Sequence, residues 1–184
     1  MMFESEFIKG LFQNAIFFLD EAISYINRGV SDRRNMILAI INMQISMELA
    51  LKSSLATNFG LRTILVEKQA NLSEKELQRL YEENNLKIKE YDSLKNFLKT
   101  PQGNIEAYNF EKPQYKYMER FQKYRNRILH SSYVFSNDEI QQMESDLIYV
   151  LIHILGVILS DRTDEEYRTF VQEYLNSCLL YTSD

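Results

Sequence analysis

The chain has 184 residues, of which 45% are hydrophobic and 26% are charged, a balance that excludes a disordered or fibrous protein. Only two prolines and five glycines occur among abundant Leu, Ile, Glu, Lys and Gln, which predicts an all-α fold. We expect an up-and-down helical bundle of about five to seven helices. The net charge of -5 gives no global reason to expect nucleic-acid binding.

The single cysteine, Cys178, excludes an intramolecular disulfide and suits a reducing compartment. The apolar residues near the N-terminus, 3–19, do not form a signal peptide, because charged residues such as Glu4 and Lys9 interrupt them. The longest apolar run, 147–159, is shorter than the roughly 20 residues that cross a bilayer. We therefore expect a cytoplasmic protein without a membrane partner.

The first half of the chain predicts two long helices. Apolar residues recur at spacings of three and four over residues 3–28, and Gly29 offers a stop. Ser31 or Asp32 can cap a second helix that runs to about residue 58. Its middle is apolar on more than one face, so we expect it to be either the most buried helix or one shared between the core and an interface.

Glu48 and Lys52 lie four residues apart in this second helix, in the order that favours an ion pair. If Glu48 points into the protein, its carboxylate needs a cationic partner. In that case an arginine from the basic segment described below is the obvious partner.

Residues 61–115 are the least regular part of the sequence. The expected elements are a continuation of the helical pattern over 61–68, a capping box at 73–76 with a short helix to about 83, a helix over 86–99, a turn at 100–104 and a loop over 109–114.

The last third predicts three helices. The first covers about residues 114–129, and a capping box at 136–139 opens a core helix to about residue 160. A third box at 163–166 opens the last helix. The end, 178–184, resembles the translation of a sequencing adapter, so we expect a non-native tail there. No linker divides the rest, so we expect a single domain over 1–177.

Charge is unevenly distributed along the chain. Residues 111–130 hold six Lys or Arg and two Glu, whereas residues 137–173 hold nine acids and two Arg. A basic surface on an acidic protein suits an anionic substrate or an acidic partner, and solvated helix faces explain the same runs.

The basic segment ends at His130, with Arg125, Asn126 and Arg127 just before it. Asn126 and His130 are four residues apart and share a helix face. Arg125 is five residues from His130, roughly 140° around an ideal helix, so the two do not converge easily in one chain. Two facing copies of the helix would bring them together across a dimer.

These residue types suit metal-free cleavage of RNA. A histidine moves protons near neutral pH, and an arginine stabilises the charge that builds on phosphorus while the 2′-hydroxyl attacks. The alternative for His130 is an interaction with the C-terminal carbonyls of its own helix. Tyr133 suits either a substrate-facing hydroxyl or a packing ring, and His153 suits a satisfied core histidine.

Arg125-Asn126-Arg127-Ile128-Leu129-His130 resembles the motif of the HEPN family (higher eukaryotes and prokaryotes nucleotide-binding domain), in which four to six residues separate an Arg and a His late in a helical bundle. Residues 48–52 are similar to the Glu-x-x-x-Lys region of an early HEPN helix, and the order of elements agrees over nearly the whole chain.

The resemblance implies a metal-independent endoribonuclease of a toxin–antitoxin or anti-phage defence system, active as a homodimer on RNA, with an antitoxin or sensor protein as a possible partner. Arg125, His130 and Asn126 would be catalytic. Arg127, Lys123, Glu48 and Tyr133 would bind RNA or support the site. Tyr133 lies three residues after His130 rather than two, which departs from the subset of the family in which an antitoxin modifies that tyrosine.

No Cys/His metal spacing or phosphate-binding Gly-rich loop occurs, so we expect no metal and no cofactor. The rival interpretation is a non-catalytic helical module that dimerises or binds a partner protein, with the motif as an interface ion network. A weaker rival is a nucleotide-binding bundle.

Overall fold

The computed structural model describes residues 2–29, 32–103, 105, 110–130 and 135–160. Over these residues the fold is an all-α helical bundle, as predicted, and its one extended pairing is an isolated antiparallel bridge between Leu65 and Ile88. The helical elements are α1 (Met2–Asn27), α2 (Arg33–Phe59), η1 (Leu61–Thr63), α3 (Glu67–Ala70), α4 (Glu74–Glu82), α5 (Tyr91–Leu98), η2 (Pro101–Gly103), α6 (Lys112–His130), α7 (Asn137–Val150), η4 (Leu151–Leu155) and α8 (Gly156–Ser160).

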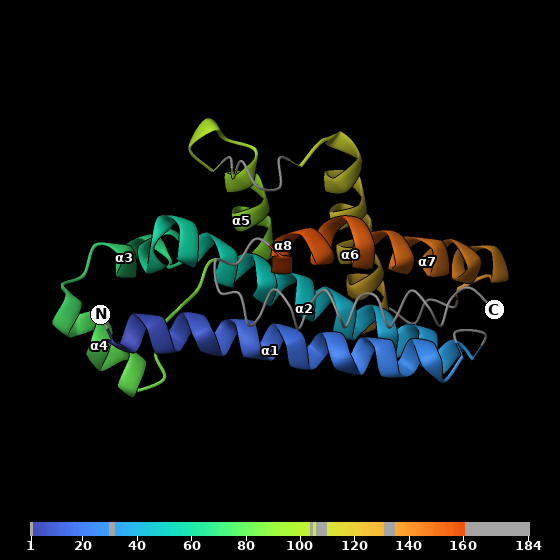
Figure 1. Ribbon diagram of the computed structural model, residues 1–184, viewed down its shortest axis with the longest axis horizontal. Coiled ribbons are helices and arrows are strands. Elements are labelled where there is room, and N and C mark those ends of the chain that lie inside the picture. The colour runs from blue at the N-terminus through green and yellow to red at the C-terminus, as the bar shows by residue number, and fades with distance from the viewer. Residues whose placement is uncertain (1, 30–31, 104, 106–109, 131–134, 161–184) are drawn as a thin grey trace.

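Helices α1 and α2 form a long antiparallel pair that runs along the length of the molecule (Figure 1). Asp32 caps α2 by accepting a hydrogen bond from the Arg34 backbone N–H at 2.8 Å, and Gly60 ends α2 with a φ of 85°. Ser46 on α2 donates to the Ala15 carbonyl at 2.7 Å, which ties the two helices through the core. Both predicted long helices are confirmed, to within a few residues at each end.

Helix α2 is the centre of the core. It contacts α1, α5, α6, α7, η4 and α8, and its side chains Met43, Met47 and Leu51 are fully buried. The prediction that the middle of this helix is the most buried segment is confirmed. Because α2 contacts both α5 and α6, polar residues on its surface can take part in a site that these helices form.

The region after α2 differs from its prediction. The helical pattern predicted over 61–68 is confirmed only in part, since η1 covers Leu61–Thr63 and α3 begins at Glu67. Between them the chain is extended: the backbone of Val66 donates to the Lys87 carbonyl at 3.0 Å, and that of Lys89 donates to the Ile64 carbonyl at 2.8 Å. The same extended pairing occupies the start of the helix predicted over 86–99, so that α5 begins at Tyr91. The capping box that opens α4 is confirmed.

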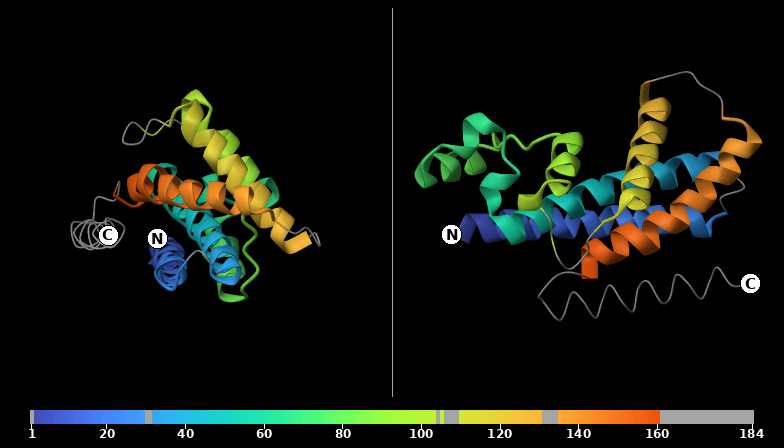
Figure 2. Two further views of the ribbon diagram at one scale, coloured as in Figure 1. Left: turned by 90° about the vertical axis from the view of Figure 1, so that its right-hand side faces the viewer. Right: turned by 90° about the horizontal axis from the view of Figure 1, so that it is seen from above.

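Helix α6 begins at Lys112, so the prediction of a loop over 109–114 is wrong for its last three residues. Pro113 lies in the first turn of α6, where its missing N–H breaks no hydrogen bond. Figures 1 and 2 show that α6 crosses the α1–α2 pair steeply, whereas α7 runs closer to the long axis.

The capping box at Ser136 opens α7 as predicted, and the helical rod then continues through η4 and α8. The segment η4 is a π-helical turn, which shifts the phase of the side chains that follow. His153 within it is exposed, and its ring centre lies 4.6 Å from that of Tyr149. The prediction of a core histidine at this position is therefore wrong.

Two helices are long and apolar enough, by length and composition, to cross a membrane: α2 and the rod over residues 137–159. The rod is longer than the apolar run 147–159, because the helix begins ten residues before that run. In each, 56% of the most apolar window is buried inside the bundle, as is common for core helices of globular proteins. The predicted last helix, the predicted tail at 178–184 and Tyr133 lie outside the described residues.

Candidate functional site

A buried carboxylate holds α6 against α7. Asp146 is fully buried and accepts two hydrogen bonds from Arg120 Nη1, at 2.9 and 3.0 Å. The hydroxyl of Tyr124 and the amide of Gln142 each donate to it at 2.8 Å. Burial, together with the bond to Asp146, raises the pKa of Tyr124 well above its ordinary value, so its hydroxyl stays a donor.

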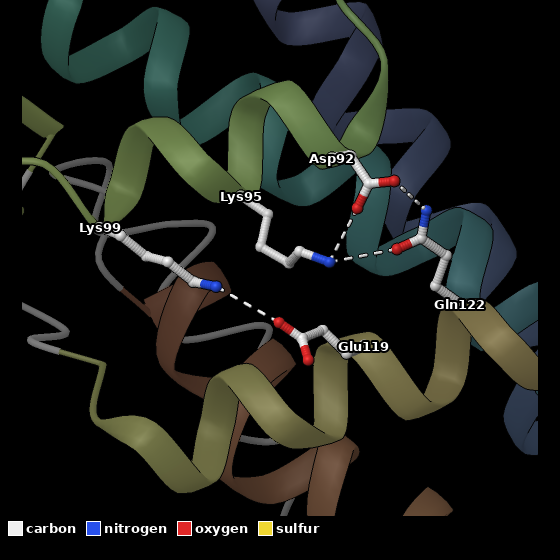
Figure 3. A network of polar contacts seen from close by, with 5 residues as sticks. All are labelled: Asp92, Lys95, Lys99, Glu119 and Gln122. Atoms are coloured by element: carbon white, nitrogen blue, oxygen red, sulfur yellow. Dashed lines mark hydrogen bonds and ion pairs between the residues drawn. The ribbon is translucent and has the colours of Figure 1, made fainter.

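A second polar network joins α6 to α5 (Figure 3). The ammonium of Lys95, which is only 4% exposed, donates to Asp92 at 2.8 Å and to Gln122 at 3.2 Å. The amide of Gln122 also donates to Asp92, at 2.9 Å, and the bonds from Lys95 and Gln122 lower the pKa of Asp92. Because each of the three side chains bonds the other two, they form a closed hydrogen-bond network that joins α5 to α6.

The arginines of α6 differ in what they contact. Arg120 pairs with Asp146, and Arg127 Nη2 lies 2.9 Å from Glu139 with its guanidinium over the ring of Phe135. Arg127, predicted to support RNA binding, is thus engaged in fastening α6 to the start of α7. Arg125 has no carboxylate partner among the described residues and donates to Asn126 Oδ1 at 3.1 Å.

Arg125 lies in a pocket of about 430 Å³ between α2, α5 and α6, which we call the Arg125 pocket. Its lining residues are Gln44, Glu48, Glu90, Tyr91, Asp92, Gln122, Arg125 and Asn126. Three residues predicted for the site therefore meet there, namely Glu48, Arg125 and Asn126. The predicted ion pair between Glu48 and Lys52 is confirmed at 2.5 Å, whereas no ion pair joins Glu48 to Arg125.

Two lining groups of this pocket lack a hydrogen-bond partner among the described residues, Gln44 Oε1 and the hydroxyl of Tyr91. Burial raises the pKa of Tyr91 well above its ordinary value, and the negative charges of Glu48 and Asp92 add to the rise. The nearby Gln44 amide opposes the rise without reaching hydrogen-bond geometry. The Tyr91 hydroxyl is therefore protonated near neutral pH.

His130 is the last residue of α6 and is exposed, and it does not line the Arg125 pocket. Lys123 is also exposed and lines a separate hollow between α6 and α7, to which Asn126 also contributes. The described part of one chain thus separates the two residues predicted to act together. This agrees with the helix geometry, which places Arg125 and His130 on different faces.

Sequence reasoning missed five lining residues: Gln44, Glu90, Tyr91, Asp92 and Gln122. One signal was present, because Gln44 is an uncharged polar residue inside the most apolar stretch of α2. Tyr91 carries no such signal, and only the packing of α5 on α2 and α6 brings it to the pocket.

No group of three or more His, Cys, Asp or Glu side chains within the described ranges could hold a metal ion. No protein-family model, curated protein or solved structure matches the chain.

Proposed function

We propose that the protein is a metal-independent endoribonuclease that cleaves RNA through its 2′-hydroxyl, and that each chain supplies half of the site. The observation that carries this proposal is the state of Arg125. It is the arginine of α6 that no described carboxylate neutralises, and it faces an open pocket. A guanidinium in that state keeps its donors available for a phosphate oxygen.

The proposed roles follow from the chemistry of the side chains. Arg125 stabilises the negative charge that develops on the phosphorus centre, and Asn126 orients it through their hydrogen bond. His130 transfers the proton between the 2′-hydroxyl and the leaving 5′-oxygen. DNA lacks the attacking hydroxyl and would not react.

A second copy of the chain would complete the site. His130 is exposed at the end of α6, where a second copy of the helix can reach it. Two α6 helices facing each other at this end would bring His130 of one copy towards Arg125 of the other. The resemblance to HEPN proteins supports the same arrangement and a role in toxin–antitoxin or anti-phage defence.

The experiment is cleavage of a mixed RNA pool in EDTA by the wild type and by Arg125→Ala and His130→Ala. Matched controls are Arg79→Ala, an exposed arginine on α4, and His153→Ala, the exposed histidine of η4. The proposal expects each motif variant to lose at least ~100-fold in rate with an unchanged circular dichroism spectrum, and both controls to cleave normally. A folded wild-type dimer that cleaves no RNA would favour the partner-binding module instead.

A further inference from the structure

Five of the six cations of α6 lie on one face of the helix, in line with its terminal histidine. They recur at spacings of three and four residues, as Lys112, Lys116, Arg120, Lys123, Arg127 and His130. At about 3.6 residues per turn they fall within a sector of roughly 80° and form a line roughly 27 Å long, which we call the basic stripe. Arg125 lies on the opposite side of the helix, so it does not belong to the stripe.

The neighbouring helices leave the basic stripe open to solvent. Figure 3 shows Glu119 and Gln122 of α6 turned towards α5, which covers one side of the helix. Helix α7 covers another side, because Asp146 on α7 accepts hydrogen bonds from Arg120 and Tyr124. The lysines of the stripe lie between these two sides and are exposed.

The basic stripe keeps an excess of positive charge after its ion pairs are counted. Asp146 neutralises Arg120 at 2.9 Å, and Glu139 lies 2.9 Å from the other arginine of the stripe. Glu119, at the edge of the stripe, is paired with a lysine of α5. The other cations make no ion pair with any described residue, namely Lys112, Lys116 and Lys123. An excess of about three positive charges thus faces solvent on a chain whose net charge is -5.

Arg120 adds hydrogen-bond donors to this charge. Both of its bonds to Asp146 come from Nη1, so the N–H groups of Nη2 and Nε are not used by that carboxylate. Arg120 and Lys123 together line the hollow between α6 and α7, which has a volume of about 490 Å³. Guanidinium and ammonium groups that face a hollow can donate to the oxygens of a phosphate.

We propose that the basic stripe binds the sugar–phosphate backbone of a single RNA strand, which runs along α6 to His130. A row of lysine side chains suits a polymer with one negative charge per residue, and it contacts phosphates without reading bases. An acidic protein offers the same sign of charge, but the stripe ends at His130, where the proposed function places proton transfer. RNA is the polyanion on which that histidine can act.

The direction of the strand rests on the proposed function, whereas binding of the strand does not. Because the basic stripe and Arg125 lie on opposite sides of α6, a strand bound to one chain would reach His130 of that chain and Arg125 of the other chain. The basic stripe would then be the path by which the strand enters the shared site.

Fluorescence anisotropy with a labelled 2′-O-methyl uridine oligomer tests the proposal, because this strand lacks the hydroxyl that cleavage needs. The triple variant Lys112→Gln/Lys116→Gln/Lys123→Gln should bind the oligomer ~10- to 100-fold more weakly than the wild type at about 100 mM salt. The slope of log affinity against log salt concentration should become shallower by about 2, since each lost phosphate contact accounts for about 0.7. Lys123→Gln alone should change the slope by about 0.7.

The matched control is Lys9→Gln/Lys75→Gln/Lys87→Gln, which removes the same charge from exposed lysines outside α6 and should bind within about threefold of the wild type. A labelled polyglutamate peptide of the same charge as the RNA strand is the second probe. No binding of the RNA strand, unchanged affinity in the α6 variant, an equal loss in the control, or tighter binding of polyglutamate would each overturn the basic stripe as an RNA site.

Cleavage of unmodified RNA is measured separately. In an active enzyme the α6 triple variant should raise KM by ~10-fold or more with kcat nearly unchanged, because the lysines hold the substrate and the transition state alike. A fall in kcat without a rise in KM would overturn the stripe as the substrate path. Binding that depends on the α6 lysines, in a chain that cleaves no RNA, would support the stripe and contradict the ribonuclease.

Discussion

The replacement Asp146→Ala tests whether the buried carboxylate fixes the position of α6. Asp146 is fully buried and accepts bonds from Arg120, Tyr124 and Gln142, so the change removes three hydrogen-bonded partners at once. A hydrogen bond to a charged group contributes about 1.5–3 kcal/mol, and breaking a buried ion pair costs about 3–5 kcal/mol.

Exposure to solvent reduces the loss of stability that Asp146→Ala causes. The side chain of Arg120 is 38% exposed and Gln142 is exposed, so water can replace Asp146 for both of them. The Tyr124 hydroxyl is buried and loses its acceptor, and the missing carboxyl leaves a small cavity. We therefore expect the free energy of unfolding to fall by about 3 kcal/mol, which lowers Tm by roughly 6–12 °C for a chain of this length.

The measurement is urea unfolding followed by circular dichroism, with a double-mutant cycle between Asp146→Ala and Tyr124→Phe. The cycle should give a coupling free energy of about 1.5–3 kcal/mol. Glu144→Ala, an exposed acid on the same helix, is the control and should change the free energy of unfolding by less than about 0.5 kcal/mol. A loss below about 1 kcal/mol for Asp146→Ala, or additive effects in the cycle, would refute the reasoning.

Two further predictions concern the walls of the Arg125 pocket. Gln44→Leu removes a buried acceptor that has no partner, so the free energy of unfolding, measured with urea, should stay the same or rise by about 1 kcal/mol. A fall of more than about 1 kcal/mol would show that the Gln44 amide makes a hydrogen bond in solution. Asp92 has its pKa lowered by its bonds to Lys95 and Gln122, so its stabilising effect is present above its ordinary value of 3.8 and is lost as the pH falls through the lower folded value. Asp92→Asn should accordingly be less stable than the wild type at pH 6, with a difference that shrinks below about pH 4; a difference that is independent of pH would contradict this assignment.

The local parts of the fold were predictable from the sequence. The spacing of apolar residues located α1 and α2, and the capping boxes at Ser73 and Ser136 located the starts of α4 and α7. The ion pair of Glu48 with Lys52 also followed from their spacing. Each of these features depends on residues within about one helical turn of each other.

The features that were missed depend on distant residues or on a change of helix phase. The pairing of Leu65 with Ile88 interrupts the helical segment predicted over 61–68 and shortens the start of the one predicted over 86–99. His153 lies within the π-helical turn η4 and is exposed, which the surrounding apolar run did not indicate.

The site itself was predicted only in part. Glu48, Arg125 and Asn126 meet in one pocket, but spacing along α6 could not show that Arg127 is engaged by Glu139 while Arg125 is not. The pocket combines side chains from three helices, and their contact depends on how α5 and α6 pack on α2. No pattern within one helix carries that information.

The central claim is that Arg125 and His130 act together across two chains. The most direct test mixes two inactive variants, Arg125→Ala and His130→Ala, and measures RNA cleavage in EDTA. A mixed dimer contains one wild-type Arg125 and one wild-type His130, on different chains. We predict that mixing restores cleavage to about a quarter to a half of the wild-type rate, since about half of the randomly exchanged dimers are mixed. A mixture in which subunits exchange but cleavage stays absent would contradict a site shared between chains.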